Sequence, residues 1–324
     1  MMNDDELLDR GGKWFRAAKD TSKDWRTETI TNYDFYAGHQ LTDEEKADLE
    51  ESLRPIITFN RVQPMVSAVQ GQEINNRREV RFYPREEGDV QVNELLTGAV
   101  QWADDECDAE DEASEIFLDL VVCGMGWSDT KMSYDEDLDG KLHTAERIDP
   151  LEMWWDHTAK RRNLADAKWI GRGKWVDRKE AETKWPKLAD VDIEGDDGTF
   201  APDPSSERSE PHDAARAHFY ENDQSDRWYN EEKDQVWVFQ LQWWEHEPVY
   251  RFQDPQTQRM ETATQEQFDR VAKVYPMVDA KSQDEGVAYV KQLRKTFYQA
   301  FIVGPSVLER GECPCPRGFT SRGS

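Results

Sequence analysis

Apolar residues recur at helical spacing through the first 124 residues. Trp14, Ala18, Trp25, Ile30 and Tyr33 follow near-helical intervals, and three later stretches repeat the pattern. The stretch LTDEEKADLE adds a helix start, because Thr42 precedes Glu45 by the three residues of a capping box. The patterns predict helices over residues 13–36, 60–74, 88–107 and 110–123, with a short strand IITFN over 56–60.

After residue 124 the apolar period changes from about 3.6 to two, which is typical of strands. The longest alternating stretch is QVWVFQLQWWEHEPVYRF, and in AKWIGRGKWVD two glycines indicate close packing rather than a phosphate loop. Two short helices are predicted over 178–185 and 264–275. The alternation predicts strands over 127–134, 141–149, 167–177, 235–252 and 287–304.

These patterns predict an α+β fold, with N-terminal helices packed beside a largely antiparallel, β-rich region. Residues 1–124 form the predicted helical region and 125–310 the β-rich region. Residues 190–226 are rich in Asp, Gly, Ser, Pro and Glu and are predicted as a long acidic surface loop. The tail 311–324 is predicted as unstructured.

The balance of charge narrows the classes of function. The 324 residues include 41 basic and 68 acidic side chains, a formal net charge of −27, which argues against gripping DNA through its phosphates. The most apolar run, IFLDLVVCGMGW, is too short to span a membrane, and the start MMNDDELLDR is not a signal peptide. The small number of cysteines (four in all) indicates a reducing, cytosolic compartment.

The stretch DEDLDGKLHTAE matches the calcium loop of an EF-hand. Asp135, Asp137, Asp139 and Glu146 occupy the ligand positions, and Gly140 the obligatory glycine. The flanks alternate like strands, so the favoured interpretation is a hairpin turn in which Gly140 supplies a positive φ. Calcium binding by the four acidic residues is the alternative.

Two tryptophan–carboxylate clusters suggest a second alternative. Trp154-Trp155-Asp156 and Trp243-Trp244-Glu245 could form a sugar platform with a carboxylate pair, as in an acidic carbohydrate-active enzyme. The favoured interpretation is that these tryptophans build a core, with one of each pair facing outward.

No motif in the chain predicts catalysis, a cofactor or a metal centre. No HExxH, Walker or GxSxG pattern occurs, and Cys313-Pro-Cys315 is too tight for a zinc site. The run Asp104–Asp119 holds nine acidic residues and no basic one, which predicts a solvated helix face, a channel lining or a contact with a basic partner. Four arginines (77, 78, 81 and 85) predict either surface ion pairs or a contact with DNA or a partner.

Several stretches in combination resemble the P22-like portal proteins of tailed bacteriophages. They are DFYAGHQL, ITFNRVQPMVSAVQGQEINNRREVRFYPRE, VVCGMGWSDTKMSY and RIDPLEMWWDHTAKRRNLADAKWIGRGKWVD, in the family's order. The later strands up to GPSVLERGECPCPRG continue the resemblance more weakly.

The resemblance implies a structural subunit without enzymatic activity. Such a subunit would form a homo-oligomeric ring, twelve-membered when full length, at one capsid vertex of the virion, after assembly in the host cytoplasm. The implied partners are the terminase large subunit, capsid or scaffolding protein, tail adaptor proteins, and double-stranded DNA that passes through the channel without sequence specificity. P22-like portals continue beyond the equivalent of CPCPRG with an apolar segment and long helices, so the ending RGFTSRGS predicts a C-terminally truncated portal.

Overall fold

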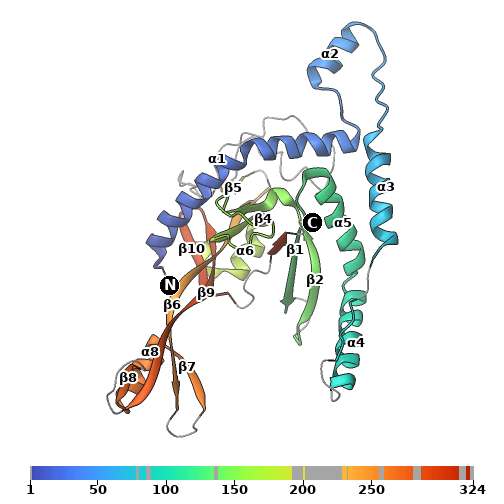
Figure 1. Cartoon of the computed structure of the whole chain (residues 1–324). Helices are drawn as coiled ribbons and strands as arrows, with labels where there is room; N and C mark the ends of the chain where they lie inside the picture. The colour runs from blue at the N-terminus through green and yellow to red at the C-terminus, as the bar shows by residue number, and fades with distance from the viewer. Residues whose placement is uncertain are drawn as a thin grey trace.

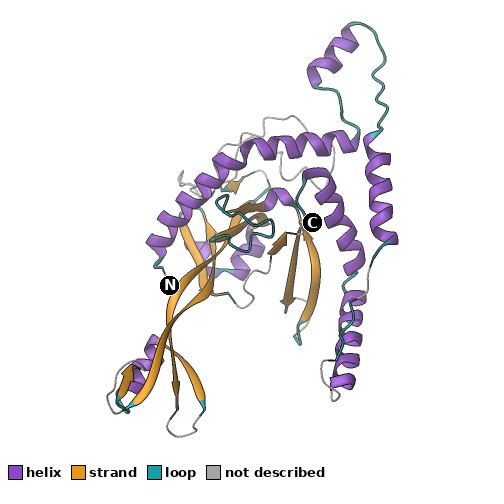
Figure 2. Cartoon of the chain, viewed as in Figure 1, coloured by secondary structure: helices purple, strands orange, loops and turns teal. Residues whose placement is uncertain are grey.

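The computed structural model confirms the α+β class: the first half of the chain is mainly helical and the second half mainly strands (Figure 2). The structure describes residues 2–77, 80–84, 89–134, 138–191, 200, 228–231, 233–254, 259–279, 286–313 and 319–321. The helices are α1 (Asp4–Ala37), α2 (Asp43–Glu51), α3 (Val62–Asn75), α4 (Val90–Glu106), α5 (Ala109–Cys123), α6 (Arg178–Lys184) and α8 (Gln265–Ala272), with short 3-10 turns η2 (Pro150–Glu152) and η3 (Pro186–Asp190).

The strands form two sheets. The small sheet has the order β11-β1-β2, and the large one has β10-β9-β6-β4-β3 with β5 and β7 beside β6 and β8 beside β9. All described pairings are antiparallel except that of β8 with β9. The strands are β1 (Trp127–Ser133), β2 (Lys141–Ile148), β3 (Met153–Trp155), β4 (Trp169–Asp177), β5 (Tyr229–Asn230), β6 (Gln235–Gln253), β7 (Met260–Thr264), β8 (Met277–Asp279), β9 (Val287–Val303), β10 (Ser306–Glu312) and β11 (Phe319–Ser321).

Helix α1 connects the large sheet with helix α5. It has 34 residues, so it is about 51 Å long, and it lies across the large sheet toward α5 (Figure 1). Its buried residues follow one stripe: Leu7 and Phe15 enter the core of the large sheet, and Tyr33 contacts α5. The spacing of three and four residues keeps these side chains on one helix face.

Glycines let aromatic rings lie flat on the large sheet. A Cβ atom on Gly171 would collide with the ring of Phe239, and one on Gly173 with the ring of Trp237. The register explains this, because Gly171 lies opposite Leu241 and Gly173 opposite Phe239, so the ring over each glycine comes from the diagonal β6 residue two positions away on the same face. The close packing predicted for these two glycines is confirmed.

The outer parts of β6 and β9 leave the large sheet as a two-stranded ribbon (Figure 1). At its tip β7, α8 and β8 enclose a separate small core. Tyr250 and Phe268 stack there with ring centroids 4.0 Å apart. We call the ribbon and its tip, residues 245–295, the arm.

Some local predictions are confirmed and some are wrong. Thr42 and Glu45 form the predicted capping box of α2. Residues 56–60 form no strand, because nothing in the described part of the chain pairs with them. The tail predicted as unstructured carries β11, whose three residues pair with Trp127–Asp129.

Most of the predicted acidic loop 190–226 lies outside the described residues. Phe200, which falls inside it, is an exception to the surface interpretation: it is buried against Phe15 and Phe239. The division of the chain at residue 124 stays a prediction. Among the described residues no helix has the length and apolarity that crossing a membrane requires.

Candidate functional site

The most unusual feature of the molecule is a band of exposed apolar side chains between residues 53 and 102. In the described part of the chain, more than half of all exposed large apolar side chains belong to it. We call it the apolar band: Leu53, Ile56, Ile57, Phe59, Val62, Met65, Val69, Ile74, Val80, Phe82, Tyr83, Val90, Val92, Leu95, Leu96 and Trp102.

The helices that carry the apolar band have almost no core of their own. Helix α3 has no buried residue, and α4 has one, Ala103. An isolated helix of 14 or 17 residues is only marginally stable in water, and apolar patches of this extent mark contact surfaces. The band is therefore a candidate surface for assembly with another protein.

Polar contacts attach α3 to α5. Arg77, two residues after the end of α3, binds Glu73 on α3 and Glu110 on α5, with N–O distances of 3.2 and 3.0 Å. Its guanidinium also donates to Ser114, and Gln70 donates to the Ser114 carbonyl at 3.3 Å. Of the two interpretations of the arginine cluster, ion pairing is therefore confirmed for Arg77. Arg78 and Arg85 lie outside the described residues.

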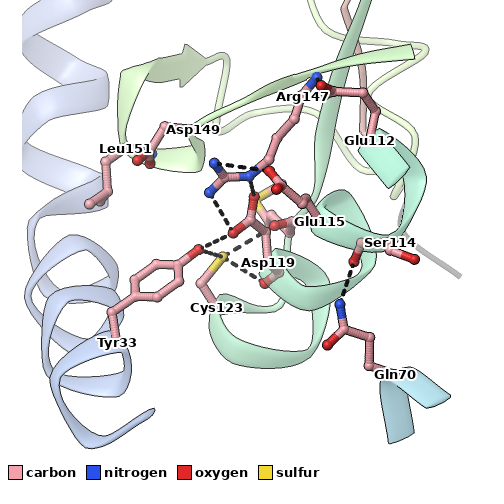
Figure 3. A network of polar contacts seen from close by, with 11 residues as sticks. Tyr33, Gln70, Glu112, Ser114, Glu115, Asp119, Cys123, Arg147, Asp149 and Leu151 are labelled. Atoms are coloured by element: carbon pink, nitrogen blue, oxygen red, sulfur yellow. Dashed lines mark hydrogen bonds and ion pairs between the residues drawn. The ribbon is translucent and has the colours of Figure 1, made fainter. Parts of the chain in front are cut away.

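A buried network fixes α5 to α1 and β2 (Figure 3). Asp119 is fully buried, and both of its oxygens accept from the Arg147 guanidinium, at 2.6 Å from Nε and 2.9 Å from the terminal nitrogen. Tyr33 donates its hydroxyl proton to the same carboxylate at 2.6 Å. The Arg147 backbone N–H donates to Glu112 at 2.6 Å. The network holds α5, the helix to which Arg77 and Gln70 attach α3, in a fixed position on α1 and β2.

Burial and charge shift two groups of this network in ways that suit a structural role. Burial is the largest single influence and lowers the pKa of Arg147, but the hydrogen bond to Asp119 and the nearby negative charges together outweigh it. The pKa of Arg147 is therefore raised and the side chain stays charged. Burial raises the pKa of the Cys123 thiol to about 11, so it is protonated and unreactive at neutral pH.

A second arginine attaches α1 to the large sheet. Arg26 donates to the carbonyl oxygens of Leu151 and Met153, each at 2.6 Å, and its guanidinium lies 3.5 Å above the ring of Trp154. The two arginines bind α1 and α5 to the strands.

The DEDLDG stretch lies between two strands, as the favoured interpretation predicted. Strands β1 and β2 flank it in antiparallel register, and Gly140 has a φ of 87°. Glu146 lies opposite Asp129 on the neighbouring strand and forms an ion pair with Lys131 at 2.6 Å. Asp135 and Asp137 lie outside the described residues, so calcium binding by all four acidic residues is not described.

The tryptophan–carboxylate clusters build core, but not in the predicted orientation. Trp154 and Trp155 are both buried, in two different hydrophobic clusters, because adjacent strand residues face opposite sides of the sheet. The prediction that one of the pair faces outward is therefore wrong for Trp154-Trp155. Trp243 is buried in the same cluster as Trp154.

The carboxylates of these clusters satisfy neighbouring donors. Asp156 accepts from Thr158 and from the Lys168 backbone N–H, and these bonds lower the pKa of Asp156 although burial opposes them. Glu245 accepts from the indole N–H of Trp243 at 3.0 Å. A groove of about 590 Å³ lies beside β6 and β9, and its lining includes neither carboxylate.

The sequence predicted no catalytic, cofactor or metal residue, and the described residues contain no group of three His, Cys, Asp or Glu side chains that could hold a metal ion. What the sequence did not reveal is the apolar band. Its apolar residues have helical spacing, so the pattern predicted a buried face where the structure has an exposed one. The spacing itself carried no signal of this, because an exposed apolar helix face has the same period as a buried one.

Comparison with protein-family models identifies a match over most of the chain. A family model described as phage P22-like portal protein matches residues 12–321, which is nearly the whole chain. A search of the curated proteins finds no match. The family match extends over α1, the apolar band, both sheets and the arm, so the chain belongs to the phage P22-like portal protein family.

Proposed function

We propose that this protein is a subunit of a closed ring at one vertex of a phage capsid, through which the genome is packaged. Membership of the portal family supports a structural, non-enzymatic role. The number of subunits implied by the resemblance is twelve. The proposal places the protein in the virion, with the host cytoplasm as the site of its assembly.

The observation that carries the proposal is the apolar band. A portal subunit must bury surface against copies of itself, and ring closure by identical subunits requires two different surfaces to meet at each joint. Helices α3 and α4 present exposed apolar side chains and have one buried residue between them. Burial in a ring would supply the stabilisation that these helices lack in the single subunit.

The remaining partners follow from the same role. In this proposal the terminase large subunit docks on the ring and supplies ATP hydrolysis, capsid or scaffolding protein surrounds it, and tail adaptor proteins attach after packaging. The formal charge of −27 suits a channel that lets double-stranded DNA pass, because phosphates are not held tightly by an acidic wall.

The test is the state of assembly of the purified chain. We expect electron microscopy and analytical ultracentrifugation to show closed rings in equilibrium with smaller species, shifting toward rings as concentration rises. A chain that stays monomeric at high concentration, including in the presence of its capsid and scaffolding proteins, would contradict the proposal.

DNA passage needs a separate test. Rings should protect or retain linear double-stranded DNA only when they are assembled with terminase and ATP, and should show weak, salt-sensitive binding alone. Tight sequence-specific binding by the ring alone would contradict a conducting role.

A further inference from the structure

The arm carries a basic and apolar stripe on one face of its ribbon. Along β9, Lys291, Leu293 and Lys295 alternate with residues of the other face, so all three side chains lie on the same side. All three are exposed, and Leu293 is 68% exposed. We call these three residues the lysine stripe.

The strand register identifies the neighbours of the lysine stripe. Lys291 lies opposite Tyr250, and Leu293 lies opposite Pro248. The Lys295 ammonium lies 3.9 Å from the centroid of the Trp244 ring. The lysine stripe therefore lies on a hydrogen-bonded, partly aromatic strand face and not on a loop.

Helix α4 carries a face of complementary character. Leu95, Trp102 and Glu106 are spaced by seven and four residues, which places them on one side of the helix, with Asp105 beside them. The four side chains are exposed, Trp102 to 65%. The one buried residue of α4, Ala103, lies on a different side. We call these four residues the acidic α4 face.

The two surfaces match in charge, apolar content and length. The lysine stripe has two cations around an exposed leucine, and the acidic α4 face has two carboxylates beside an exposed tryptophan and leucine. From Lys291 to Lys295 is about 13 Å along a strand. From Leu95 to Glu106 is about 16 Å along a helix. Lysine ammonium groups also bind favourably to the face of a tryptophan ring.

The positions of the two surfaces exclude a contact within one copy and suit a contact between copies. The arm and α4 project from opposite sides of the molecule and toward the same end of it (Figure 1). A second copy placed alongside in the same orientation brings the arm of one beside α4 of the other. Such a contact joins two different surfaces, which is the arrangement that a closed ring of identical subunits requires.

We propose that the lysine stripe of one copy packs on the acidic α4 face of the next copy, with Leu293 against Trp102 and the two lysines beside Asp105 and Glu106. This inference rests on the proposed ring, and it names the two surfaces that meet at each joint. In this contact the lysines are the basic partner that one interpretation of the acidic run beginning at Asp104 predicts.

Charge reversal on both sides tests the contact. The variants are K291E/K295E on the arm and D105K/E106K on α4, measured by analytical ultracentrifugation after circular dichroism and melting curves show that each variant folds. We expect each double variant to weaken self-association by about tenfold or more, since like charges then face each other across the joint. Combining all four substitutions in one chain should restore most of the association.

A matched control tests whether the effect depends on the position of the substituted lysines or only on the change in net charge. R270E/K273E changes the charge of the arm by the same amount at two exposed residues of α8 and its end, and should leave association close to that of the unaltered chain. The proposed contact is supported if the fourfold variant regains self-association and R270E/K273E leaves self-association unchanged.

Crosslinking gives an independent readout. A chain with both W102C and L293C should form a ladder of disulfide-linked multimers on oxidation of the assembled protein, and either single variant should give none.

Two results would overturn the contact, and they differ in what else they affect. If the unaltered chain assembles while K291E/K295E and D105K/E106K assemble equally well, the contact is wrong and the proposed ring stands. If the unaltered chain never assembles, the ring and the contact fail together.

Discussion

The large sheet with α1 buries its apolar side chains, whereas the helical pair α3–α4 exposes most of its own. In the large sheet the aromatic side chains are buried: Trp237, Phe239 and Trp243 are each at most 2% exposed. In the helical pair Met65 and Leu95 are each more than 70% exposed. Both regions are rich in apolar residues, so composition does not separate them; the presence of a facing layer does.

The difference teaches which part of the subunit can fold alone. Burial of aromatic side chains against α1 supplies free energy to the single chain. The helical pair depends on the buried Asp119–Arg147 network and on the contacts of Arg77 for its position, and its apolar surface gains free energy only on assembly. Four predictions test this division, beginning with the largest expected effect.

Phe239→Ala should lower the free energy of unfolding by about 3–5 kcal/mol. The ring of Phe239 is fully buried against Phe15, Phe200 and Gly171, so its removal leaves a cavity that the sheet cannot close. Chemical denaturation followed by tryptophan fluorescence measures the change. A loss below about 1 kcal/mol would mean that the core is not closely packed.

Arg147→Met should cost about 3 kcal/mol, because it leaves the fully buried Asp119 carboxylate without its cation. The control is Arg178→Met, which breaks a half-exposed pair with Glu182 one helical turn away and should cost about 0.5 kcal/mol or less. Equal costs for the two variants would show that the network does not fix α5 to the sheets.

Cys123 should make stability fall as the pH rises from about 9 to about 11. Its folded pKa of about 11 lies above the ordinary value of 9.0, so the unfolded chain loses this proton first and is favoured as pH rises through that window. The contribution lost is about 2–3 kcal/mol. Denaturation at a series of pH values measures it, and Cys123→Ala, which has no proton to lose there, should show a shallower fall.

Met65→Ser should change the stability of the single subunit by no more than about 0.5 kcal/mol, because Met65 is 71% exposed. The same variant should weaken self-association, since it removes apolar surface from the apolar band. Hydrogen exchange adds a second measure: amides of α3 should exchange faster than those of β6 in the monomer and slow down on assembly. Equal protection of α3 and β6 in the monomer would contradict the division.

The local sequence pattern predicted the structure correctly where residues close together in the sequence determine it. The capping box at Thr42 and Glu45 formed because its partners are three residues apart. The hairpin around Gly140 and the long strand β6 followed from turn chemistry and alternation. The P22-like portal family was also identified from the combination of stretches, and the family match confirms it.

The sequence pattern gave wrong predictions where a residue or strand far away in the sequence determines burial or pairing. Asp119 was counted with a solvated acidic face, yet it is fully buried because Arg147, 28 residues later, neutralises it. The apolar residues 56–60 predicted a strand, yet no strand of the described chain lies beside them to pair. Trp154 and Trp155 both became core because layers cover both faces of β3.

The sequence alone determined the α+β class, the positions of most helices and strands, and the family, since each depends on spacing and on residues that are close together. Only the tertiary structure decided which apolar stripes are covered and which stay open. Burial depends on what lies opposite, and no layer in the described part of the single chain covers the exposed apolar side chains of α3 and α4.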